Sequence, residues 1–306
     1  MVHTLSVHNA IRMLGLFAAL LVSGALGDAR AAQEWQQALD RVGRNQPEAR
    51  IVVVSVRDGK MVASLHLREA ARTLAAPGST LKPLVLYQAL QSRNWDANRR
   101  VPCAGDLVIA GRRLACSHPG APPFDARQAL AWSCNTYFAQ VAHAVSAARL
   151  AEMLRSSGLL ERTGLADEEA VAEFHPPRTL DQAQLAVLGV EGIRVTPLEL
   201  AIAYRWLASQ LAAHSGDAAA QTVEGGLADA ASFGIAAAAS QGGASVAGKT
   251  GTADSAGSAQ THGWFAGLAP AINPDVVIVV YLPAGRGMDA ARVAGQVLAG
   301  VRLEHK

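Results

Sequence analysis

Ser79 and Lys82 lie three residues apart, and their spacing brings together two side chains that can do chemistry. A Pro-Gly turn precedes Ser79, and an apolar run of helical character, residues 84–90, follows Lys82. Residues at i and i+3 share a helix face, with Cβ atoms about 5–6 Å apart. A hydroxyl beside an amine at a helix N-terminus is a nucleophile with a base in reach. A capping serine and a surface lysine would give the same spacing, so the pair alone does not decide between these readings.

Lysine usage favours the chemical interpretation. The chain has 27 lysines and arginines, yet lysine occurs only as Lys60, Lys82, Lys249 and Lys306. Arginine stays charged in proteins, whereas the pKa of a lysine shifts readily, so only lysine can lose its proton and act as a base. Burial and a second cation, Lys249, would both lower the pKa of Lys82, as a general base requires. We therefore predict that Ser79 is a nucleophile and Lys82 its base.

The elements that position this pair follow from hydropathy and turn residues. Strands are predicted at residues 51–56, 61–65, 246–253, 263–269 and 276–282, and Asp58-Gly59 predicts a hairpin between the first two. Helices are predicted at residues 35–42, 79–92, 125–145, 148–157, 198–211, 223–239 and 289–301. Thr196 is the expected N-cap of the helix that Pro197 opens. Strands at both ends predict an α/β (α+β) fold, with one antiparallel sheet built from both termini, flanking helices and an inserted all-helical subdomain.

Composition and the N-terminal residues indicate an exported globular protein. Half of the 306 residues are hydrophobic and 17% are charged, which excludes a disordered chain, and a net charge of +2 gives no reason to expect nucleic acid as a partner. Arg12 precedes an apolar stretch, residues 13–26, that is shorter than the ~20 residues of a spanning helix. Residues 29–31 then supply a small-x-small cleavage pattern. We predict a signal peptide at residues 1–31, with an uncleaved anchor or a buried helix as alternatives.

Three cysteines, Cys103, Cys116 and Cys134, fit an oxidising compartment. Cys103 and Cys116 bracket a short apolar stretch that is expected to form a small hairpin, and we predict that they form a disulfide, with Cys134 unpaired. Closing such a loop would stabilise the fold by about 3 kcal/mol. Three unpaired thiols are the alternative. The chain shows no cysteine and histidine spacing typical of zinc, so we expect no metal and no cofactor. The histidines, His118 and His262 among them, are predicted to be surface or capping residues.

Three short polar clusters carry a resemblance to a known family. They are Ser79-Thr80-Leu81-Lys82, Ser133-Cys134-Asn135 and Lys249-Thr250-Gly251, and they occur in the order S-x-x-K, S-x-N, K-T-G that marks penicillin-binding proteins and serine β-lactamases. Residues 77–83, 133–138, 195–201, 248–253 and 263–270 resemble the penicillin-binding transpeptidase domain most closely. The resemblance covers residues 32–306. It implies an α/β part at about 32–87 and 212–306, and a helical part at about 88–211.

The resemblance also implies roles for site residues. Ser79, Lys82 and Ser133 would be catalytic, with Ser133 relaying a proton to the leaving nitrogen. Asn135, Lys249, Thr250, Gly251 and Thr252 would bind substrate, and backbone N–H groups of Ser79 and Thr252 would form the oxyanion hole. A cation and two hydroxyls at positions 249, 250 and 252 suit a terminal carboxylate. Trp264, in the strand that follows, is expected to be a packing residue.

The implied activity is acyl transfer on D-Ala-D-Ala-type peptidoglycan stem peptides, in the bacterial periplasm or at the extracytoplasmic face, with β-lactams as covalent inhibitors. A D,D-transpeptidase is favoured, and a D,D-carboxypeptidase or a β-lactamase is the alternative. A class A β-lactamase would need a glutamate in the wording E-x-x-L-N, which is absent around Glu168, Glu169 and Glu173. A non-turnover β-lactam or muropeptide sensor, or an idle scaffold, is the alternative of another class. A cell-wall protein that recruits this chain is expected as a further partner, although the sequence does not identify which one.

Overall fold

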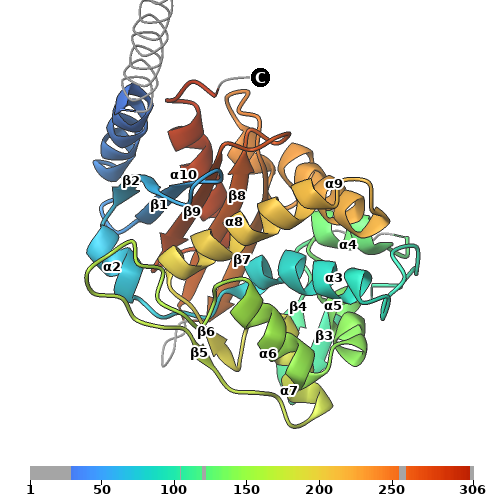
Figure 1. The fold of residues 1–306 in the computed structure, drawn as a ribbon. Coiled ribbons are helices and arrows are strands. Elements are labelled where there is room, and N and C mark those ends of the chain that lie inside the picture. Colours follow the sequence, from blue (N-terminus) through green and yellow to red (C-terminus); the bar gives the residue numbers. More distant parts are fainter. Residues whose placement is uncertain (1–28, 104, 119–121, 255–259, 304–306) are drawn as a thin grey trace, which may run out of the picture.

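The computed structural model describes residues 29–103, 105–118, 122–254 and 260–303 (Figure 1). The predicted signal peptide lies outside the described residues apart from residues 29–31, which begin a helix that continues to residue 43. In the part of the chain that the structure describes, no helix combines the length and the apolar composition needed to cross a membrane.

A five-stranded antiparallel sheet forms the centre of the described chain, in the order β2-β1-β9-β8-β7. The N-terminal part supplies β1 (Arg50–Ser55) and β2 (Met61–Leu65). The C-terminal part supplies β7 (Ala247–Asp254), β8 (Thr261–Ala269) and β9 (Val276–Leu282). The central strand β9 pairs with β1 on one side and β8 on the other, so the two ends of the chain meet in one sheet. The predicted α/β class, with one antiparallel sheet built from both termini and flanked by helices, is confirmed. The inserted part is not all-helical, because two short strand pairs lie within residues 88–211.

Of the following helices, all but the last lie between the two halves of the sheet in the chain, and the last follows β9. They are α2 (Leu67–Arg72), α3 (Lys82–Gln91), α4 (Ala126–Ala131), α5 (Asn135–Val141), α6 (Ala147–Ser156), α7 (Leu180–Val187), α8 (Pro197–Ala213), α9 (Ala218–Ser232) and α10 (Gly287–Leu298). Short 3₁₀ turns are η1 (Gly78–Leu81), η2 (Ala142–Ala144) and η3 (Ala237–Ser240). Two small antiparallel pairs lie outside the main sheet, β3 (Asp106–Ile109) with β4 (Arg112–Ala115), and β5 (Glu173–Phe174) with β6 (Ile193–Arg194).

Both faces of the sheet are covered, because successive side chains of a strand point to opposite faces. On β1, Val52 and Val54 pack into the core that contains α3 and α8. Their neighbours Ile51 and Val53 pack into a second core, which contains the N-terminal helix and α10. All seven residues of β9 are buried. A strand with apolar neighbours on both faces accounts for the unbroken apolar run at residues 276–282.

Helix α8 begins as predicted and lies against the sheet. The Thr196 hydroxyl accepts a hydrogen bond from the Glu199 N–H at 3.1 Å, and the Glu199 carboxylate accepts one from the Thr196 N–H at 2.9 Å. This reciprocal capping box, with Pro197 in the first turn, starts the helix. Figure 1 shows α8 across the sheet, where it contacts β1, β8 and β9. The domain boundaries remain a prediction. Helix α8, which falls mostly in the predicted helical part, packs against the sheet of the α/β part.

The predicted helix at residues 125–145 is interrupted. Helix α4 ends at Ala131, and α5 begins only at Asn135. Between them Ser133 takes a left-handed conformation, with φ of 57°. This conformation is costly for a residue other than glycine and is incompatible with a continuous right-handed helix. The break places Ser133 and Asn135 at a bend rather than on one helical face.

Candidate active site

Ser79 and Lys82 are one tight turn apart. Ser79 lies in η1, and the backbone N–H of Lys82 donates to the Ser79 carbonyl as α3 begins. Side chains three residues apart in a tight turn leave the backbone on the same face, so the Ser79 and Lys82 side chains begin on one side of this turn. Ser79 is half-buried and Lys82 is fully buried. The predicted pairing of a hydroxyl with an amine at a helix start thus matches the backbone geometry.

Close backbone packing holds the Ser79 turn against β7. Gly78 has φ of 55°, and a Cβ there would lie 2.8 Å from the Thr252 carbonyl oxygen and 2.9 Å from the Thr252 nitrogen. A Cβ on Gly251 would lie 2.4 Å from the Pro77 carbonyl oxygen. These distances are too short for any side chain. The first and third motifs therefore meet backbone to backbone because both carry glycine at the contact.

Side chains from distant elements also hold this turn. Trp264 Nε1 donates to the Ala76 carbonyl at 2.9 Å, and His262 Nε2 lies 2.8 Å from the same oxygen. The Tyr204 hydroxyl of α8 donates to the Thr80 carbonyl at 2.9 Å. Trp264 was expected only to pack, and His262 was expected at the surface, but both are buried beside the turn. Neither Tyr204 nor His262 has a local sequence pattern that links it to Ser79, so neither was predicted as a site residue.

The amine of Lys82 joins the first motif to the second. Its Nζ donates to the Ser133 carbonyl at 3.0 Å, to Ser133 Oγ at 3.3 Å and to Asn135 Oδ1 at 2.7 Å. Burial lowers the pKa of Lys82 from 10.5 to about 8, although the neighbouring cysteines raise it in part. An amine with this pKa is partly neutral near neutral pH. It can accept a proton, as a general base must.

The second motif is oriented by the β3–β4 hairpin. Asn135 Nδ2 donates to the Ala115 carbonyl at 3.1 Å and to the Leu114 carbonyl at 3.4 Å, both on β4. Its Oδ1 accepts from Lys82, so both ends of the amide are engaged. Ser133 is half-buried and held in its left-handed turn. Strained backbone of this kind is common at functional sites, where the surrounding structure maintains it.

The third motif runs along β7, which is an edge strand of the sheet. Lys249 is buried, its Nζ donates to the Thr250 carbonyl at 3.0 Å, and burial together with the charge of Lys82 lowers its pKa. Thr250 is buried, whereas Thr252 is exposed and its Oγ1 accepts from the Gly287 N–H at 2.9 Å. Contacts among the three motifs therefore bring all the predicted site residues to one region.

The predicted disulfide is not formed in the structure. Cys103 Sγ and Cys116 Sγ lie 3.3 Å apart, well beyond the ~2.05 Å of a disulfide bond, and all three cysteines are free thiols. His118, expected at the surface, lies in the same cluster with its Nε2 3.4 Å from Cys103 Sγ. Hydrogen bonding, first from Cys134, lowers the pKa of Cys116 to about 4.

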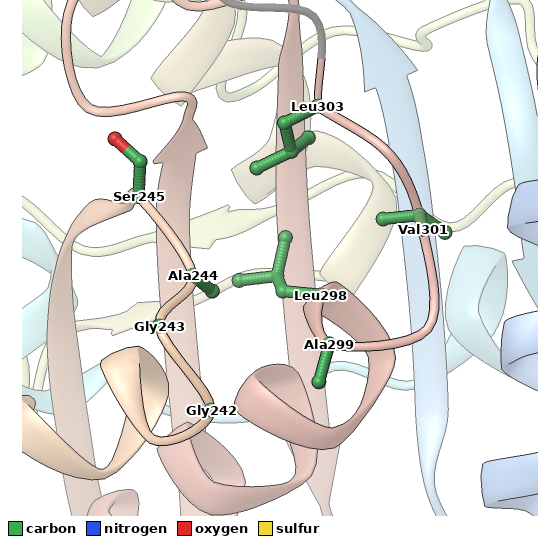
Figure 2. Close-up of a pocket in the computed structure, with 8 residues that line it drawn as sticks. All are labelled: Gly242, Gly243, Ala244, Ser245, Leu298, Ala299, Val301 and Leu303. Carbon is green, nitrogen blue, oxygen red and sulfur yellow. The ribbon is translucent and has the colours of Figure 1, made fainter.

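A pocket of about 210 Å³ lies elsewhere, between the segment that precedes β7 and the end of α10 (Figure 2). Its described lining consists of small and aliphatic residues and carries no titratable side chain: Gly242, Gly243, Ala244, Ser245, Leu298, Ala299, Val301 and Leu303. None of the three motifs lines it. The convergent polar groups around Lys82, rather than this pocket, mark the candidate site.

Comparisons with known proteins identify the family. The family model described as penicillin binding protein transpeptidase domain matches residues 49–301. The chain therefore belongs to the penicillin-binding protein transpeptidase domain family. A comparison with proteins of curated function finds no match.

Solved structures share the fold at low identity. A peptidoglycan glycosyltransferase from Burkholderia ambifaria is similar with a TM-score of 0.75 and 21% identity, over 89% of this chain and 93% of that one. The transpeptidase domain of Burkholderia pseudomallei penicillin-binding protein 3 gives 0.73 and 20%, over 89% and 92%. The D,D-transpeptidase domain of a peptidoglycan glycosyltransferase from Eggerthella lenta gives 0.73 and 22%, over 87% and 80%. These matches establish the architecture.

Proposed function

We propose that this chain is an exported serine D,D-transpeptidase that acts on peptidoglycan stem peptides through an acyl-Ser79 intermediate and binds penicillin covalently. The observation that carries the proposal is the Lys82 amine, which is buried, has a pKa lowered to about 8 and contacts both Ser133 and Asn135. Family membership supports the substrate class. Proteins of this family act outside the cytoplasm, in agreement with the export predicted from residues 1–31.

Acylation begins when Ser79 Oγ attacks the carbonyl carbon of the penultimate D-alanine. The hydroxyl proton passes to neutral Lys82 Nζ, and backbone N–H groups of Ser79 and Thr252 stabilise the oxyanion. Collapse of the tetrahedral intermediate breaks the C–N bond. Ser133 Oγ, 3.3 Å from Lys82 Nζ, passes its proton to the leaving amine and takes the proton held by Lys82, which becomes neutral again. An acceptor amine then takes the acyl group from the Ser79 ester and restores the free hydroxyl.

Substrate binding falls to the second and third motifs. Lys249, Thr250 and Thr252 hold the terminal carboxylate, because a cation and two hydroxyls provide the charge and donors that it needs. The Asn135 side chain hydrogen-bonds the substrate amide. Gly251, on an edge strand, lets the substrate backbone approach β7 without a side chain in the way. The substrate would therefore lie along β7 with its scissile carbonyl at Ser79.

The glutamates considered for β-lactam hydrolysis are occupied elsewhere. The Glu169 carboxylate caps a loop and accepts from the backbone N–H groups of residues 163–166. Glu168 forms ion pairs with Arg72 and Arg68. Glu173 pairs with Arg194 at 3.3 Å. Among the described residues, none of these three carboxylates hydrogen-bonds to or pairs with a residue of the three motifs, which favours slow deacylation over β-lactamase activity.

Labelling with a fluorescent penicillin tests the proposal. The wild-type chain is expected to form a stable adduct at the peptide that contains Ser79, and Ser79→Ala is expected to form none. Ser92→Ala is the matched control, because Ser92 lies at the other end of α3 and its hydroxyl donates to the backbone carbonyls of Gln88 and Ala89, away from the three motifs. Absence of label on the wild-type chain would exclude acyl transfer.

A stem-peptide substrate offered with a labelled D-amino acid separates the fates of the acyl-enzyme. Incorporation of the labelled amine identifies transpeptidation, and release of D-alanine alone identifies carboxypeptidation. Loss of the penicillin label within seconds would identify a β-lactamase. A stable penicillin adduct without any turnover of peptide would instead identify a sensor.

A further inference from the structure

Three cysteines and a histidine gather beside the second motif. Cys103, Cys116, His118 and Cys134 each offer one ligand atom, and these four atoms all lie within 4.8 Å of one another. Cys103 Sγ is 3.3 Å from Cys116 Sγ and 3.4 Å from His118 Nε2. Cys134 is buried, and the other three residues are half-buried, so the cluster is enclosed yet can be reached from solvent. Four donor atoms therefore converge on one small space.

The spacing of these atoms fits a tetrahedral metal ion. With Zn–S bonds of about 2.3 Å and Zn–N bonds of about 2.0 Å, tetrahedral geometry separates ligand atoms by about 3.5–3.8 Å. The Cys103–Cys116 sulfur separation of 3.3 Å is about 0.5 Å shorter than two Zn–S bonds require, and the Cys103–His118 separation of 3.4 Å is close to the required S–N value. The 4.8 Å limit exceeds the range by about 1 Å, so small side-chain movements would bring the four atoms onto one ion. Thiolates with one imidazole are a donor set that suits zinc. We propose that Cys103, Cys116, His118 and Cys134 bind one structural zinc ion.

Surrounding contacts hold the ligands in place, as outer contacts do at metal sites. The backbone N–H of Asn135 donates to Cys116 Sγ at 3.2 Å, which stabilises a thiolate. The His118 ring packs edge-on against Phe124, with centroids 4.9 Å apart. The Cys116 N–H donates to the Gly105 carbonyl at 2.7 Å and closes the base of the β3–β4 hairpin. Three chain segments thus present their ligands in defined orientations.

A disulfide accounts for the cluster less well than a metal does. A Cys103–Cys116 bond would use two of the three sulfur atoms and leave the buried Cys134 thiol and the His118 ring against it. A four-coordinate zinc ion uses all four groups and leaves no open position, which is the arrangement of structural sites.

The zinc ion would fasten the β3–β4 hairpin to the start of α5. Cys116 directly follows β4, and Cys134 directly precedes Asn135. Asn135 contacts this hairpin with its side chain and Cys116 with its backbone. The spacing Cys-x₁₂-Cys-x-His-x₁₅-Cys lacks the close cysteine pair of common zinc motifs, which is why the sequence analysis predicted no metal. The proposal stands independently of the acyl-transfer reaction.

The metal content of the full chain tests this proposal. Protein reduced under anaerobic conditions, loaded with Zn²⁺ and dialysed is expected to retain about one zinc per chain. Co²⁺ in place of Zn²⁺ is expected to give the visible bands of a tetrahedral ion and a thiolate-to-cobalt charge-transfer band. His118→Ala should weaken zinc binding by tenfold or more, whereas His143→Ala should leave it unchanged, because His143 is exposed in η2 and outside the cluster.

Two results would overturn the proposal. One is fully reduced wild-type protein that retains no zinc and gives no tetrahedral Co²⁺ spectrum, a measurement that depends on no variant. The other is protein isolated without reductant or chelator that holds no zinc and carries a Cys103–Cys116 cross-link in peptide mass spectrometry. Neither result bears on penicillin labelling at Ser79, so failure of the metal site and failure of the proposed activity are distinguishable.

Discussion

The rate of acylation should depend on pH through Lys82. If neutral Lys82 is the base, the rate follows the fraction of this amine that has lost its proton. With a pKa of about 8, that fraction is about 1% at pH 6, about 9% at pH 7, about 50% at pH 8 and about 90% at pH 9. Acylation should therefore rise about tenfold from pH 6 to 7, about fivefold from pH 7 to 8 and less than twofold from pH 8 to 9.

Stopped-flow labelling with a fluorescent penicillin measures this profile as a second-order rate constant at fixed ionic strength. Lys82→Arg keeps a cation but removes the base, because guanidinium does not deprotonate, and should lower the rate by about 10²–10⁴-fold. Lys60→Arg is the matched control, since Lys60 is exposed and pairs with Asp58 at 3.4 Å. Its profile should superimpose on that of the wild type.

A profile that is flat between pH 6 and 9 would refute the assignment of Lys82 as the base. A Lys82→Arg variant that acylates at the wild-type rate would refute it independently. Either result would require another group to take the proton from Ser79.

Three further predictions concern stability and packing. The folded pKa of Lys82 lies below its value in the unfolded chain, so the unfolded state binds more protons between pH 8 and 10.5. The contribution of Lys82 to the free energy of unfolding should therefore rise by about 3 kcal/mol across this window. Urea titrations should show that Lys82→Met lacks this rise, and parallel curves for the two chains would contradict the burial argument. Gly251→Ala should lower penicillin acylation more than tenfold, because its Cβ would lie 2.4 Å from the Pro77 carbonyl oxygen. Gly216→Ala is the control and should leave the rate unchanged, because a Cβ there meets nothing within 4 Å. Equal rates for the two variants would show that the Ser79 turn tolerates displacement. Thr196→Ala removes the N-cap of α8 and should lower the free energy of unfolding by about 1–2 kcal/mol, measured by thermal or urea unfolding. The rate of acylation should change little. An unchanged unfolding midpoint would show that the cap does not stabilise the fold.

Local patterns in the sequence were sufficient for the sheet strands and for the start of α8. The β-branched run at residues 276–282 became β9, and the Thr196-Pro197 pair became a capping box. Such features depend on neighbouring residues, and neighbours in sequence are neighbours in space along a strand or a helical turn. The Ser79–Lys82 turn belongs to this class, because a spacing of three residues already limits where the two side chains lie.

The predictions that differ from the structure involve longer range. Helix periodicity favoured one continuous helix through Ser133, but the structure has a left-handed turn there. In this turn the Ser133 carbonyl accepts a hydrogen bond from Lys82, and the Asn135 side chain donates to the β3–β4 hairpin. The positions of His118 and His262 depend on segments far away in the chain. No spacing rule connects His262 to Ala76, which lies 186 residues earlier.

The amino-acid sequence was thus enough to identify the three motifs, their order and most of the helices and strands that carry them, because each motif is short and local. Only the tertiary structure decided how deeply Lys82 is buried, and hence that its pKa falls to about 8. It also decided that Asn135 joins Lys82 to β4, and that three cysteines and His118 converge. Burial and convergence are properties of surfaces brought together from distant segments, and a linear pattern does not contain them.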